Sequence, residues 1–78
     1  MNRKELIDIG WNINKEDTNV FVANKDQYEL SYDESNTDLH ILKRWLRGLD
    51  GPLFRETLFL GKCPDVETFK LVCKLLEI

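Results

Sequence analysis

Residues 38–49 constrain the possible folds most strongly, because they can be wound into a helix with two different faces. Their sequence is Asp-Leu-His-Ile-Leu-Lys-Arg-Trp-Leu-Arg-Gly-Leu. At about 100° per residue, one side of such a helix is apolar and the other side is polar. The apolar side holds Leu39, Ile41, Leu42, Trp45, Leu46 and Leu49, and the polar side holds His40, Lys43, Arg44, Arg47 and Gly48. This separation favours a helix over residues 38–49.

A β-strand over residues 39–45 is the alternative. Leu39 and Ile41 flank the polar His40, as in a strand with one buried face. Strict alternation fails at Leu42, however, and fails again at the pair Trp45-Leu46. A helix accommodates all six apolar positions and is therefore our prediction, whereas the strand would give the order αβββα.

The size and composition of the chain indicate a small globular protein. We expect one domain over residues 1–78, because 78 residues are too few for two separate cores. The apolar fraction of 42% argues against disorder. The sequence contains no signal peptide and no apolar run near the roughly 18 residues of a membrane span. We therefore expect a cytoplasmic protein.

In the reducing cytoplasm, Cys63 and Cys73 are predicted to remain unbonded. Cys73 falls on an apolar helix face and is expected in the core, whereas Cys63 falls in a loop and is expected to be more exposed. Two cysteines and one histidine do not make a recognisable zinc site, which needs about four ligands. We expect neither a metal nor a cofactor.

A short helix is predicted at the start of the chain, over about residues 3–9. Asn2 and Glu5 have the spacing of a capping box. Gly10 is suited to end the helix, and Trp11 can then fold back onto its last turn.

Two β-strands are predicted next, joined as a hairpin. Residues 20–23 are β-branched or aromatic, and Tyr28, Leu30 and Tyr32 alternate with polar residues. Residues 12–19 are polar and rich in turn formers, so they are predicted to be a loop. Residues 53–60 are predicted to be a further strand, central in the sheet because its end is apolar on both faces.

The last predicted helix, over about residues 65–77, has more apolar residues than one buried face needs. Its expected core stripe is Val66, Phe69, Val72, Cys73 and Leu76. Leu71, Leu75 and Ile78 form a second stripe, more than about 90° away around the helix. We expect this second stripe to be buried within the monomer, with an interface to a partner as the alternative.

These elements predict an α+β protein in the order α-β-β-α-β-α, with a small antiparallel sheet of about three strands packed by helices. The polar side of the helix over 38–49 is the candidate binding site, because His40, Lys43, Arg44 and Arg47 would stand in one row. Arg55 and Lys62 could extend that row if the next strand lies nearby. Such a row can follow a phosphate backbone or an acidic protein surface.

The expected function is non-catalytic. The sequence has no Gly-rich phosphate loop and no serine at a strand-to-helix elbow, so we do not expect an enzyme. The leading hypothesis is a protein–protein interaction module, such as an accessory or inhibitor protein of phage or mobile-element type, with weak self-association as a further option. The alternative is a small RNA- or DNA-binding domain that uses the basic helix face. A net charge of −3 and a pI of about 5.0 argue against this alternative.

Overall fold

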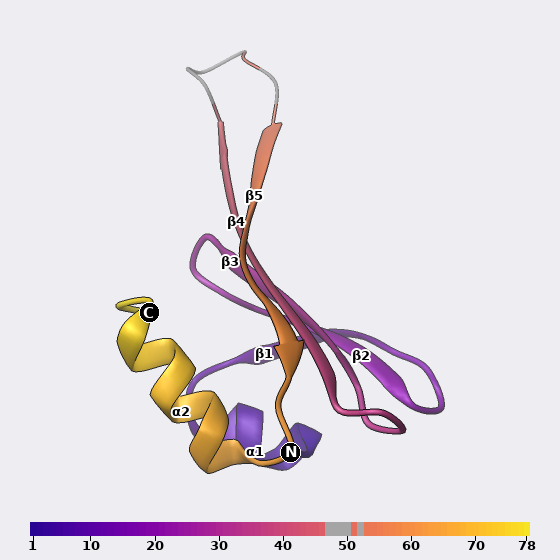
Figure 1. Ribbon diagram of the computed structural model, residues 1–78. Helices are drawn as coiled ribbons and strands as arrows, with labels where there is room; N and C mark the ends of the chain where they lie inside the picture. The colour runs from indigo at the N-terminus through magenta and orange to yellow at the C-terminus, as the bar shows by residue number, and fades with distance from the viewer. Residues whose placement is uncertain (47–50, 52) are drawn as a thin grey trace.

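The computed structural model describes residues 1–46, 51 and 53–78, and it shows two helices and one antiparallel sheet (Figure 1). The elements follow the order α1 (Arg3–Asp8), β1 (Asn12–Glu16), β2 (Val20–Lys25), β3 (Tyr28–Asp33), β4 (Asp38–Leu46), β5 (Leu53–Lys62) and α2 (Val66–Leu75). The strand order in the sheet is β1-β2-β3-β4-β5, so each strand pairs with its neighbour in the chain. The predicted α+β class is confirmed, but the sheet has five strands rather than about three.

Helix α1 begins and ends as its sequence predicts. The Asn2 side chain accepts a hydrogen bond from the Glu5 amide at 2.9 Å, and the Glu5 carboxylate accepts one from the Asn2 amide at 2.9 Å. Gly10 has a φ of 99°, a backbone conformation that costs glycine little. The Trp11 amide donates to the Leu6 carbonyl at 3.0 Å, and this bond closes the Schellman ending.

The predicted β2–β3 hairpin is also confirmed. Its register runs from Val20 opposite Asp33 to Lys25 opposite Tyr28, which leaves a two-residue turn. Asp26 in this turn has a φ of 54°, a conformation that Asp tolerates better than most residues.

Residues 38–46 form a strand, so the predicted helix over 38–49 is wrong for the described residues. The alternative strand over 39–45 is confirmed, but the order αβββα that accompanied it is wrong, because the sheet has five strands. Strand β4 pairs with β3 on one side and with β5 on the other. Leu39 and Ile41 are fully buried, whereas His40 lies on the opposite face. Strand β4 has a strand on each edge and a covered face that buries Leu39 and Ile41, and Leu42 adds an apolar residue on the other face. These apolar residues together resemble one side of a helical wheel.

The two edges of the sheet also differ from the sequence prediction. Residues 12–16, predicted as part of a loop, form edge strand β1, whose only partner in the sheet is β2. Strand β5, predicted to be central, is the other edge. Leu60 in β5 lies opposite His40, on the face that the helices leave uncovered, and is 72% exposed.

The core lies between the sheet and the two helices, which cover the same face of the sheet (Figure 1). The ring centroids of Trp11 and Phe69 are 5.7 Å apart in an edge-on arrangement. Cys63 is fully buried and Cys73 only partly, which reverses our expectation for the two thiols; both are unbonded. The buried side chains of this single cluster are Leu6, Trp11, Phe21, Ala23, Leu30, Tyr32, Leu39, Ile41, Cys63 and Phe69.

Candidate functional site

The predicted cationic row does not exist as one face, because its residues alternate along a strand. His40 and Arg44 lie on the face of β4 that the helices leave uncovered, whereas Lys43 lies on the helix-covered face. All three side chains are half-buried rather than fully exposed. Arg47, the fourth member, lies outside the described residues.

The sheet nevertheless brings Arg44 and Arg55 together, as a directly opposite pair between β4 and β5. Directly opposite residues on antiparallel strands share a face and lie about 5 Å apart at their Cβ atoms. Arg44 forms an ion pair with Glu29 at 3.2 Å. Within the described residues no ion pair involves Arg55. The pair therefore leaves positive charge at this point of the uncovered face.

The other polar residues of this hairpin have partners within it. A ring nitrogen of His40 is 2.9 Å from the Thr57 hydroxyl. Lys43 lies opposite Glu56. Lys62 pairs with Asp38 at 2.6 Å and so does not extend a cationic row. Among the described residues of β4 and β5, the Arg44–Arg55 pair is therefore the prominent positive charge.

The ends of β4 and β5 project beyond the rest of the sheet (Figure 1). Strand β3 pairs with β4 only as far as Lys43, so residues 44–46 and 53–55 form a two-stranded extension, which we name the β4–β5 arm. The rings of Trp45 and Phe54 stack across this arm with centroids 5.8 Å apart. Trp45 was expected to be buried but is 39% exposed.

The predicted second stripe of α2 is divided between solvent and core. Leu71 and Leu75 are 63% and 84% exposed, so the expectation of burial is wrong for both. Ile78 instead packs against the core cluster. The outer surface of α2 therefore presents two leucines that no described element covers.

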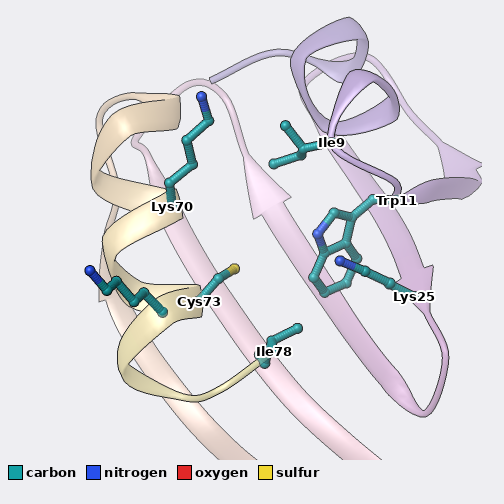
Figure 2. A pocket seen from close by; sticks show the side chains of 7 residues that line it. Ile9, Trp11, Lys25, Lys70, Cys73 and Ile78 are labelled. Atoms are coloured by element: carbon teal, nitrogen blue, oxygen red, sulfur yellow. The ribbon is translucent and has the colours of Figure 1, made fainter.

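A cavity of about 350 Å³ lies between α2, the end of α1 and strand β2 (Figure 2). Figure 2 shows Cys73 pointing toward the Trp11 ring and Lys25 of β2 lying beside that ring, whereas Lys70 of α2 lines the rim with its ammonium group directed away from Trp11. Sequence reasoning missed this site because its cations are far apart in the chain. The spacing of Lys70 and Lys74 was the one available signal. The lining residues are Ile9, Trp11, Lys25, Lys70, Cys73, Lys74 and Ile78.

Burial suppresses the reactivity of both cysteines. It raises the pKa of the Cys63 thiol above its ordinary value of 9.0, with a smaller contribution from Asp65. It raises the pKa of Cys73 to about 11, although the nearby Lys25 ammonium offsets part of the rise. Both thiols are therefore protonated at neutral pH, and a protonated thiol is a poor nucleophile.

The part of the chain that the structure describes contains no group of three or more His, Cys, Asp or Glu side chains placed to hold a metal ion. Neither of its helices has the length and apolar content that crossing a bilayer requires. Comparisons with protein-family models, with curated proteins and with solved structures found no match.

Proposed function

We propose that this chain is a non-catalytic interaction module that binds an acidic protein partner through the β4–β5 arm. The observation that carries the proposal is that the arm presents the directly opposite Arg44–Arg55 pair on one face and the exposed Trp45, the next residue along β4, on the other. Like charges directly opposite each other destabilise a sheet, so the fold alone gives no reason to place them there. Carboxylates of a partner would relieve this repulsion.

The composition of the arm supports a protein contact. Trp and Arg are the residues most enriched among those that dominate binding energy at protein interfaces. The stacked Trp45 and Phe54 rings supply apolar area on the face of the arm opposite to the arginines. A cavity of about 300 Å³, lined by Gln27, Lys43, Trp45 and Glu56, offers a recess beside Trp45 for an apolar side chain of the partner.

The absence of catalysis is part of the same proposal. Both thiols are protonated at neutral pH, which removes the best nucleophiles among the described residues. His40 is held by the Thr57 hydroxyl. We place the protein in the cytoplasm, where the two thiols would stay reduced.

The test compares partner capture by arm variants and by a matched control. Tagged wild-type protein is used for capture from the source cell after nuclease treatment, and captured proteins are identified by mass spectrometry. The leading partner is then purified and titrated by calorimetry. We expect Trp45→Ala and Arg55→Glu each to weaken its binding at least tenfold. Lys15→Glu, a charge reversal on exposed β1, should leave the affinity within about twofold. Equal losses from all three variants would refute the arm as the site.

Nucleic acid is the second candidate, because arginines beside an exposed aromatic ring also suit a single strand. Purified protein is titrated with fluorescent single-stranded RNA and DNA at about 50 mM salt. Affinity that falls steeply between about 50 and 200 mM salt and is lost in Arg55→Glu would favour nucleic acid. It would also overturn the proposal of a protein partner. The proposal predicts no such binding.

A further inference from the structure

The lining of the cavity between α2 and β2 combines apolar and polar side chains. Trp11 forms part of its wall, although almost all of the Trp11 surface is covered by the protein. Ile9, Cys73 and Ile78 are half-buried and pack against the core, so they complete the apolar part of the lining. An apolar recess of this kind favours the carbon skeleton of a ligand over water.

The charged groups that line the same cavity are all cations. Lys25 comes from β2, and Lys70 and Lys74 come from α2. Lys70 has a loose contact with Glu67 at 3.5 Å. No ion pair within the described residues involves Lys25 or Lys74. The protonated Cys73 thiol adds no negative charge, so the cavity offers a carbon-binding recess beside unneutralised ammonium groups.

We propose that this cavity binds a small organic anion, with an apolar body against Trp11 and a carboxylate or phosphate group held by Lys25 and Lys70. A volume of about 350 Å³ lies at the lower end of the range for small-molecule sites, so a ligand of about ten non-hydrogen atoms suits this cavity. The site is separate from the β4–β5 arm, so the proposal does not depend on the function proposed above.

Trp11 provides a built-in reporter for the test. A Trp45→Phe background leaves Trp11 as the single tryptophan, since the chain has two. Octanoate, octyl phosphate and the uncharged octanol are titrated against this protein while its fluorescence is recorded. We expect at least one of the two anions to bind about tenfold more tightly than octanol, because only an anion can pair with the lysines. Whichever anion binds more tightly identifies the preferred head group.

Lysine variants then test the head-group contact. Lys25→Gln and Lys70→Gln should each weaken anion binding about two- to fivefold, the range expected for a partly exposed ion pair, and leave octanol binding unchanged. Lys25→Arg should retain most of the affinity. Lys43→Gln, which removes a lysine outside the cavity, is the matched control. Equal affinities for anions and octanol, or no fluorescence change with any of the three, would overturn the proposal. Equal effects of Lys43→Gln and Lys25→Gln would do the same.

Discussion

At the scale of single residues, the best-defined tertiary interaction is the buried hydrogen bond of Tyr32. Its hydroxyl donates to the Cys63 carbonyl at 2.7 Å and so ties strand β3 to the segment that leads into α2. Burial, together with the charge of Cys63, raises the pKa of Tyr32 above its ordinary value of 10.0. The neutral phenol is therefore the form that this site stabilises.

Replacing Tyr32 by Phe should lower the free energy of unfolding by about 1–2 kcal/mol. The reason is that the buried Cys63 carbonyl would lose its hydrogen-bond donor while the packing of the ring is kept. Urea unfolding followed by circular dichroism measures the change. Tyr28→Phe is the control, since no hydrogen bond of the Tyr28 hydroxyl is found among the described residues. Equal effects of the two substitutions would contradict this account.

The Cys73 thiol should make the fold less stable at alkaline pH. Its pKa is about 11 in the folded protein and near 9.0 in the unfolded chain, so the unfolded chain binds fewer protons between these values. The contribution of the Cys73 thiol to the free energy of unfolding is therefore constant below about pH 9 and falls as pH rises toward 11. Because Cys73 is only half-buried, we expect a loss of about 1 kcal/mol by pH 10.5. Urea midpoints at pH 7 and 10.5 should differ less in Cys73→Ala than in the wild type.

At the scale of the elements, the β4–β5 hairpin carries a local conflict. Arg44 and Arg55 lie opposite each other, and Glu29 compensates only the first of them through its ion pair. The same positions of the hairpin would be more stable with opposite charges. We therefore expect charge changes in the arm that raise the stability of the fold to weaken binding of the partner.

Arg55→Glu should raise the free energy of unfolding by about 0.5–1 kcal/mol, because it replaces a repulsive cross-strand pair with an attractive one. Arg55→Gln should give a smaller increase, since it removes the repulsion without adding attraction. Thermal unfolding at low salt measures both. A loss of stability in Arg55→Glu at constant secondary structure would show that the repulsion is absent.

Helix α2 should respond very differently to changes on its two sides. Phe69 is fully buried, so Phe69→Ala should cost about 3–5 kcal/mol, enough to unfold a large share of the molecules. Leu75 is 84% exposed, so Leu75→Ala should change the free energy of unfolding by less than about 0.5 kcal/mol. Chemical unfolding of both variants is the measurement. A large cost for Leu75→Ala, together with a concentration-dependent mass in sedimentation, would instead indicate self-association through Leu71 and Leu75.

At the scale of the whole molecule, the contacts that hold the sheet in place are unevenly distributed along it. One face of the sheet is covered by both helices, and the β4–β5 arm extends past them (Figure 1). Near α1, Arg3 binds Glu34 at 2.6 Å and Glu16 at 3.3 Å, and its guanidinium lies 5.0 Å from the centre of the Phe21 ring. Several side-chain contacts thus anchor the molecule at the α1 end, whereas among the described residues the arm is tied to the rest of the sheet mainly through Arg44, by its ion pair with Glu29 and its amide bond to the Gln27 carbonyl.

Hydrogen exchange should reveal this gradient along a single strand. The Ile41 amide lies where β4 has a strand on each side, and the Trp45 amide lies in the arm. We expect Trp45 to exchange at least about tenfold faster than Ile41, because the arm can open without unfolding the core. Both residues face the same side of the strand, which makes them a matched pair. Equal exchange rates would show that the arm opens only together with the core.

Several features of this protein could be predicted from the sequence because they depend on neighbouring residues. The Asn2–Glu5 capping box and the ending at Gly10 both involve residues within a few positions of each other. The β2–β3 hairpin also follows from local alternation and a two-residue turn. The sequence predicted that Arg55 would lie near Arg44 only if the next strand were adjacent to residues 38–49.

Tertiary structure alone decided the conformation of residues 38–46 and the positions of the two edge strands. The pattern of residues 38–46 fits a helix and a central strand almost equally well, and hydrogen bonds to β3 and β5 decide between them. The polar β1 has little apolar signal, and it forms because β2 offers a free edge. The cavity beside Lys25, Lys70 and Lys74 likewise requires β2 and α2 to meet. Contacts between segments that are distant in the chain leave no regular spacing of apolar residues in the sequence. These features can therefore be recognised only in the assembled fold.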